Sequence, residues 1–117
     1  MVKGVHHVQI SVAPDQVDAS RRFYIELLGM KSIVDPFNGS GFWPAAGEQQ
    51  LHVRVEANVD RRKTSAHPAF LVESVVALQE TLLAEGFKID PQPKMEGFDR
   101  FHVLDPSGNR IELMQRL

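Results

Sequence analysis

The strand-like run His7-Val-Gln-Ile-Ser-Val12 is matched, 60 positions later, by His67-Pro-Ala-Phe-Leu-Val72, and both runs open with a histidine. A helical segment that ends at a glycine follows each run, at Gly29 in the first half and at Gly86 in the second. Each half then closes with a short strand, Gln49-Gln-Leu-His52 or Asn109-Arg-Ile-Glu112. The shared order predicts two copies of one unit, about residues 4–56 and about residues 66–114 of a single domain, 1–117.

Alternation of apolar and polar residues predicts the strands and their faces. Val8, Ile10 and Val12 alternate with polar residues, the period-two pattern of a strand with one buried face. We expect Asp15 to cap the helix that follows and Gly29 to end it in a left-handed conformation. With a tight turn at Asp105-Pro-Ser-Gly108, each half is predicted to be a βαβββ unit with its polar strand faces on the concave side of the sheet.

Composition limits the classes of function. The 117 residues carry a formal net charge of −2 and no cysteine, which excludes disulfides, thiolate metal ligands and a cysteine nucleophile. We expect no nucleic-acid partner, because basic residues are not gathered beyond the cluster Arg61-Arg-Lys63, which we interpret as a linker. No apolar run is long enough to cross a membrane, and we expect a cytoplasmic protein.

Four potential metal ligands recur at one spacing in the two halves. His7 and His52 are 45 positions apart, and so are His67 and Glu112. Two units brought face to face would supply three imidazoles and one carboxylate, which suit Zn²⁺, Ni²⁺, Fe²⁺, Co²⁺ or Mn²⁺ and not Ca²⁺ or Mg²⁺. Glu112 lies between Ile111 and Leu113, and a carboxylate between two core residues is costly unless it is paired or bound to metal.

Five further residues are expected to line the same cavity, because they lie on or beside the strands that carry the ligands. His102 is an expected pocket-wall or proton-transfer group, with a packed ring as the alternative, and the 60-residue shift matches it to Phe42. The predicted pocket residues are Gln9, Phe42, Arg54, Arg100 and His102. The predicted catalytic residues are Glu112 and His102.

Four pieces of the chain resemble the vicinal oxygen chelate superfamily, also called the glyoxalase, bleomycin-resistance and dioxygenase family. They are His6-His-Val-Gln-Ile10, Arg22-Phe-Tyr-Ile-Glu-Leu-Leu-Gly29, His67-Pro-Ala-Phe-Leu-Val72 and Asp105-Pro-Ser-Gly-Asn-Arg-Ile-Glu-Leu113. The resemblance implies an α+β fold in which two βαβββ modules, related by pseudo-two-fold symmetry, form an eight-stranded open barrel around a central cleft. It also implies metal ligands at His7, His67 and Glu112, whereas His52 stands where bacterial-type glyoxalase I enzymes have a glutamate.

The resemblance leaves several functions open. We expect a metal-dependent glyoxalase-like enzyme that acts on a small, metal-chelating oxygenated substrate by lyase or isomerase chemistry, with Glu112 as the base. An Fe²⁺ extradiol dioxygenase using His7, His67 and Glu112 is the enzyme alternative, and a fosfomycin-type thiol transferase is less favoured. A metal-free protein that sequesters a drug or metabolite is the alternative from another class. A homodimer is expected, because an open barrel leaves strand edges to cover.

Overall fold

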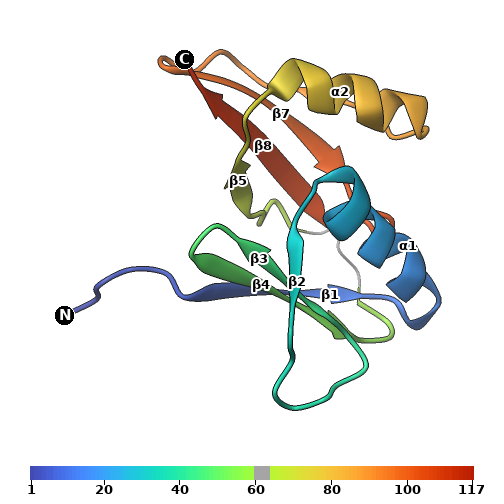
Figure 1. The fold of residues 1–117 in the computed structure, drawn as a ribbon. Coiled ribbons are helices and arrows are strands. Elements are labelled where there is room, and N and C mark those ends of the chain that lie inside the picture. The colour runs from blue at the N-terminus through green and yellow to red at the C-terminus, as the bar shows by residue number, and fades with distance from the viewer. Residues whose placement is uncertain (60–63) are drawn as a thin grey trace. The chain divides into compact units, whose positions relative to one another are not determined.

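The computed structural model describes residues 1–59 and 64–117, and the chain divides into two compact units, Met1–Asp60 and Arg61–Leu117. Each unit contains one four-stranded mixed sheet and one main helical segment (Figure 1). The predicted linker cluster Arg61-Arg-Lys63 lies outside the described residues. None of the helices described is both long and apolar enough to span a membrane.

The first unit follows the predicted order of elements. Strand β1 (His7–Val12) leads into a continuous helical segment, made of a 3-10 turn η1 (Pro14–Gln16), α1 (Val17–Arg21) and a π-helical stretch η2 (Arg22–Leu27). Strands β2 (Lys31–Ile33), β3 (Trp43–Ala46) and β4 (Gln49–Val55) complete the unit. The strand order is β1-β4-β3-β2, with β1 parallel to β4 and the other pairs antiparallel.

The second unit repeats this topology. It consists of β5 (Ala69–Leu71), α2 (Val75–Ala84), β6 (Asp90–Pro91), β7 (Phe98–Leu104) and β8 (Arg110–Arg116). The strand order is β5-β8-β7-β6, again with one parallel pair, and α2 packs on β7 and β8 (Figure 1). The α+β prediction of two βαβββ modules is confirmed. Their closure into one eight-stranded open barrel stays a prediction.

Local signals set the ends of the helices, with one correction. Gly29 and Gly86 have φ of +73° and +88°, so both end their helices in the predicted left-handed conformation. Asp15 was the wrong N-cap: Ala13 holds that position without a side-chain hydrogen bond, and Asp15 lies inside the first turn. The adjacent Pro14 explains the difference, because proline favours the first helical position and shifts the start of the helix by two residues.

Buried apolar residues form the core of each unit and position the polar site. In the second unit the strands β7 and β8 contribute Phe101, Val103, Ile111 and Leu113, all nearly inaccessible to solvent. Glu112 points to the opposite face of β8 from its two neighbours and is nevertheless only 5% exposed. Strand β8 is therefore covered on both faces at this position.

The register of the strands shows how closely the two modules match. In the parallel pairs, Gln9 lies opposite His52 and Ala69 lies opposite Glu112, which is the predicted 60-residue repeat. In the antiparallel pairs, Phe42 lies opposite Val53 and Phe101 lies opposite Leu113. Val53 and Leu113 are still 60 residues apart, but Phe42 and Phe101 are only 59 apart, so β7 matches β3 with a 59-residue repeat.

One extra turn residue causes this change of repeat. The β3–β4 turn has two residues between Ala46 and Gln49, and the β7–β8 turn has three between Asp105 and Asn109. His102 therefore corresponds to Trp43, and the predicted match to Phe42 was wrong. A shift of one residue exchanges the two faces of a strand, so this correction changes which side chain lies beside His52.

Candidate functional site

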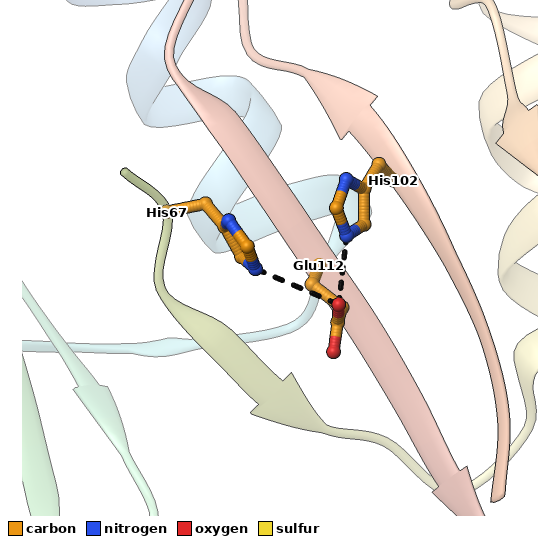
Figure 2. A group of neighbouring side chains, drawn as sticks. All are labelled: His67, His102 and Glu112. Carbon is orange, nitrogen blue, oxygen red and sulfur yellow. Dashed lines mark hydrogen bonds and ion pairs between the residues drawn. The ribbon is translucent and has the colours of Figure 1, made fainter. Parts of the chain in front are cut away.

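Three potential metal ligands meet in the second unit. His67 precedes β5, His102 lies on β7 and Glu112 lies on β8, and one nitrogen or oxygen atom from each falls within 4.8 Å of the others (Figure 2). His102 lies directly opposite Glu112 in the antiparallel pair. His67 comes from the other side of β8, because β5 is the parallel neighbour of that strand.

The carboxylate of Glu112 is the centre of this group. Its Oε1 atom accepts hydrogen bonds from Nε2 of His102 at 2.7 Å and from Arg100 at 2.9 Å, and Nε2 of His67 lies 3.6 Å away. Burial raises the pKa of Glu112, but the hydrogen bonds from His102 and Arg100 outweigh it, so the pKa lies below its usual value. Glu112 is therefore ionised at neutral pH.

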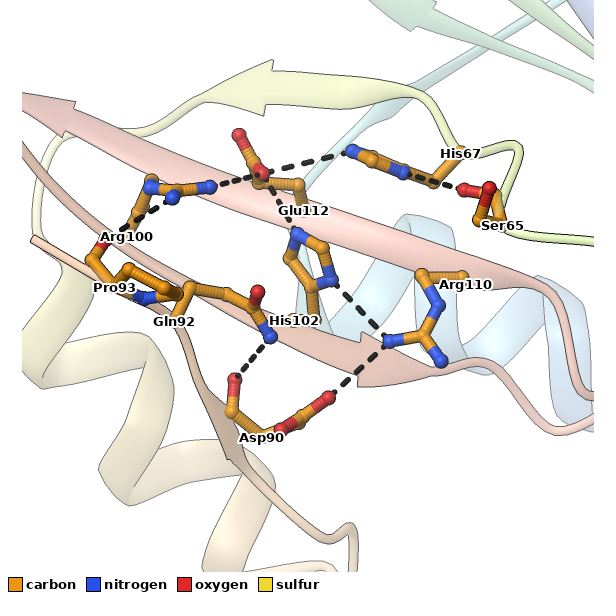
Figure 3. Close-up of polar contacts among 9 residues, drawn as sticks. All are labelled: Ser65, His67, Asp90, Gln92, Pro93, Arg100, His102, Arg110 and Glu112. Atoms are coloured by element: carbon orange, nitrogen blue, oxygen red, sulfur yellow. Dashed lines mark hydrogen bonds and ion pairs between the residues drawn. The ribbon is translucent and has the colours of Figure 1, made fainter. Parts of the chain in front are cut away.

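The two neighbours of His102 select one tautomer of its ring. Its Nδ1 atom lies 3.3 Å from a guanidinium nitrogen of Arg110, which can only donate a hydrogen bond. Nδ1 must therefore accept, and Nε2 carries the hydrogen that it donates to Glu112. Arg110 is itself paired with Asp90 at 3.2 Å, so a row of polar contacts extends from Asp90 through Arg110 and His102 to Glu112 (Figure 3).

His67 presents the complementary arrangement. Its Nδ1 atom lies 2.9 Å from the carbonyl oxygen of Ser65, to which it can only donate (Figure 3). In the neutral ring the lone pair on Nε2 then faces Oε1 of Glu112 across 3.6 Å. Two acceptors that face each other repel, and a proton on Nε2 or a metal ion between them would remove this repulsion.

A divalent transition ion fits between His67 and Glu112. Two ligand atoms that each lie about 2.1 Å from one ion can be separated by up to about 4.2 Å, and 3.6 Å falls within that limit. An imidazole nitrogen and a carboxylate oxygen are a suitable donor pair for Zn²⁺, Ni²⁺, Fe²⁺, Co²⁺ or Mn²⁺. His102 fits less well, because its nitrogen nearest the site carries a hydrogen.

The two predicted ligands of the first unit lie together in an aromatic stack. The ring of His52 stacks on His7 at 4.0 Å between centroids and on Trp43 at 3.5 Å, with interplanar angles of 15° and 9°. An imidazole binds a metal in its own ring plane, so two parallel rings 4 Å apart cannot bind the same ion. Joint ligation by His7 and His52 would require one ring to leave the stack.

His52 is uncharged in this setting. Burial lowers its pKa, and the neighbouring His7 and His6 lower it further. Its Nε2 atom is hydrogen-bonded to the side-chain oxygen of Gln50 at 2.9 Å. The two modules thus place an uncharged imidazole and an ionised carboxylate at equivalent positions.

The predicted pocket residues fall into different surroundings. Arg100 and His102 contact Glu112 directly. Gln9 is exposed on β1 opposite His52, and Arg54 is exposed with its Nε 4.0 Å from Glu56. Phe42 is buried beside Tyr24 of the helical segment, with ring centroids 6.4 Å apart, so we leave it out of the site proposed below.

Sequence reasoning missed three residues of the polar contacts. Arg110 and Gln50 each lie two positions before a predicted ligand on the same strand, Glu112 or His52. Residues two apart share one face of a strand, so this spacing was a usable signal. Trp43, the third of these residues, covers one face of His52.

Comparisons with known proteins agree with this architecture. A family model described as the Glyoxalase/Bleomycin resistance protein/Dioxygenase superfamily matches residues 4–113. The chain is similar to a solved structure assigned to the glyoxalase family from Bacillus anthracis, with 33% identity, a TM-score of 0.87, and coverage of 100% of this chain and 98% of that chain. No curated protein sequence matches it.

Two more distant structures show the fold alone. The fosfomycin resistance protein FosX from Listeria monocytogenes is 17% identical, with a TM-score of 0.80 and coverage of 100% of this chain and 96% of that chain. TnmS3, an antibiotic binding protein from Streptomyces sp. CB03234, is 21% identical, with a TM-score of 0.71 and coverage of 99% and 98%. On the match of the family model, the chain belongs to the Glyoxalase/Bleomycin resistance protein/Dioxygenase superfamily.

Proposed function

We propose that this protein is a metal-dependent enzyme that acts on a small oxygenated substrate by lyase or isomerase chemistry. The observation that supports it most is the pair of facing acceptors, Nε2 of His67 and Oε1 of Glu112, at 3.6 Å. This spacing and donor set fit a divalent transition ion, and members of the family are expected to bind one. The second unit supplies His67 and Glu112 as ligands in this proposal.

The remaining ligands are proposed to come from a first module. His7 and His52, from the same chain or from a partner copy, are the residues predicted for this role, and their joint use requires one ring to leave the stack. When bound, the ion would act as a Lewis acid that polarises a substrate oxygen and stabilises negative charge formed next to it.

The protein's own groups have separable roles in this proposal. Glu112 is ionised, which suits an anionic ligand, but its lowered pKa makes it a weak proton acceptor while His102 and Arg100 are bonded to it. His102 holds the carboxylate in place through its Nε2 hydrogen, so it is a positioning residue. Glu112 becomes the acid-base group of the proposed reaction only when some of these hydrogen bonds are released.

Metal binding tests the proposal most directly. Protein freed of metal by a chelator would be titrated with Zn²⁺, Ni²⁺, Co²⁺, Mn²⁺ and anaerobic Fe²⁺ by calorimetry, alongside His67→Ala and Glu112→Ala. We expect the wild type to bind one ion per chain and both variants to lose binding while keeping their circular dichroism. Glu80→Ala, at an exposed position on α2, is the matched control. A wild type that binds none of these ions would refute the proposal.

The reaction can be sought once the metal is known. The loaded protein would be screened against methylglyoxal–thiol adducts, catechols and epoxides. Isomerised or lyase products from the first class would support the leading proposal. Ring cleavage of a catechol with Fe²⁺ would identify the dioxygenase alternative instead.

One observation favours a different class, a metal-free binding protein. Glu112 already accepts hydrogen bonds from Arg100 and His102, so its charge is balanced without a metal ion. Such a protein would bind a drug or metabolite equally well with and without chelator. Unchanged ligand affinity on metal removal, together with no turnover, would favour sequestration over catalysis.

A further inference from the structure

Arg100 contacts the carboxylate that the proposed metal would need. Its guanidinium donates one hydrogen bond to Oε1 of Glu112 at 2.9 Å and another to the carbonyl oxygen of Pro93 at 3.0 Å (Figure 3). Its Nε atom is buried and has no hydrogen-bond partner among the described residues. The guanidinium is therefore held by these two hydrogen bonds, and the one to ionised Glu112 joins two charged groups.

The hydrogen-bonding capacity of Oε1 is already used. A carboxylate oxygen has two lone-pair directions, and His102 and Arg100 donate to this atom at 2.7 and 2.9 Å. An ion that bonds Oε1 from the side of His67 must displace one of these donors. Arg100 is the one that a divalent cation would displace, because two positive charges beside one oxygen repel each other.

We propose that Arg100 is a built-in counter-cation: it occupies Glu112 in the metal-free protein and must leave when a metal ion binds. The residue thereby lowers the affinity of the site for metal and keeps the empty site stable. This inference rests on the metal site of the proposed function.

The first module, which lacks an arginine at the equivalent position, supports the role proposed for Arg100. The 59-residue repeat of the antiparallel strands places Gly41 where the second module has Arg100, one residue before the matched Phe42 and Phe101. The first module therefore has no cation at this position, and its central residue, His52, is uncharged. The arginine occurs in the module with the ionised carboxylate and is not required by the fold itself.

The test compares Arg100→Gln with the wild type and with Arg116→Gln, which removes an equal charge from an exposed position on β8. Metal affinity would be measured by calorimetry with Zn²⁺ or Ni²⁺. We expect Arg100→Gln to bind roughly 10- to 100-fold more tightly than the wild type, since one charge-assisted hydrogen bond no longer competes. Arg116→Gln should match the wild type. Equal or weaker binding by Arg100→Gln would overturn the inference.

A second measurement needs no metal. The stability of Arg100→Gln, Glu112→Gln and the double variant would be measured by urea unfolding in the presence of a chelator. We expect Arg100→Gln to cost much less stability in the Glu112→Gln background than in the wild type, because the arginine then has no charged partner. Absence of this coupling would overturn the inference even if the protein binds metal. Should Arg100→Gln fail to fold, Arg100→Lys replaces it, and we expect a smaller gain in metal affinity; a loss would count against the inference.

The outcomes separate the two proposals. If the wild type and Arg100→Gln bind metal with the same affinity, the proposed function stands and the counter-cation role is refuted. If neither binds any ion, the metal site is refuted and the counter-cation role falls with it. Binding by Arg100→Gln alone would support the counter-cation role and refute the proposed function of the wild type.

Discussion

Neutralising Glu112 should lower the free energy of unfolding of the metal-free protein, by an amount that depends strongly on pH. In the Glu112→Gln variant the new side chain has nearly the same shape as glutamate and can still accept hydrogen bonds from His102 and Arg100, but it carries no charge. A hydrogen bond to a charged group contributes about 1.5–3 kcal/mol, against about 0.5–1.5 kcal/mol for a neutral one. With two such bonds at Oε1, we expect a loss of about 2–3 kcal/mol at pH 7.

The sign of the pH dependence follows from the lowered pKa. The unfolded carboxyl has a pKa of about 4.5 and the folded one lies below it. The stabilisation by ionised Glu112 is therefore fully present above about pH 4.5 and is lost as the pH falls from there through the folded value. The difference in stability between wild type and Glu112→Gln should shrink over that range.

Urea unfolding in the presence of a chelator, in steps from pH 7 to about pH 3, measures this difference. Glu80→Gln, an exposed glutamate on α2, is the control and should change stability by less than about 0.5 kcal/mol. The reasoning would be refuted by a Glu112→Gln penalty that is the same at both ends of the pH range. It would equally be refuted by a penalty no larger than the control's at pH 7.

Three further predictions concern other parts of the chain. The pKa of His52 is lowered in the folded protein, so the unfolded state takes up a proton first and the stability should fall as the pH drops below about 6.5. In urea titrations between about pH 7.5 and 5.5, His52→Phe should make the stability depend less on pH. Asp105→Ala removes the acceptor of the Ser107 and Asn109 backbone N–H groups in the β7–β8 turn and should cost about 2–4 kcal/mol in thermal or urea unfolding, whereas Asp99→Ala should cost little. Light scattering at micromolar concentration should show a homodimer, since β1 and β5 are edge strands; a monomer at every concentration would contradict this.

The parts of the fold that follow local rules were predictable. Period-two alternation located the strands, and glycines at the helix ends located the turns of the chain, because both depend on the backbone within a few residues. The 60-residue repeat also held in the parallel pairs, where Glu112 was expected to match His52. The buried carboxylate of Glu112 is paired with Arg100 and His102, and its role as a metal ligand stays a prediction.

The parts that depend on long-range register were not predictable from spacing. One extra residue in the second turn changed the match of His102 from Phe42 to Trp43, and no pattern within the strand itself reveals such a shift. The hydrogen bonds of Arg100 to Glu112 and of Arg110 to His102 depend on side chains reaching across a strand pair. Sequence patterns identify the residue types in such a network, and only coordinates show which atoms donate and which accept.

Gly41 makes the divergence of the two halves difficult to reverse. A Cβ atom there would lie 1.7 Å from the carbonyl oxygen of Val53, so no side chain can be added without moving the segment before β3 away from β4. A gene duplication produces two identical halves, but a single codon change can no longer give the first half an arginine like Arg100. Protein engineers who want a second charged centre in the first half would have to redesign the backbone spacing before choosing the residue.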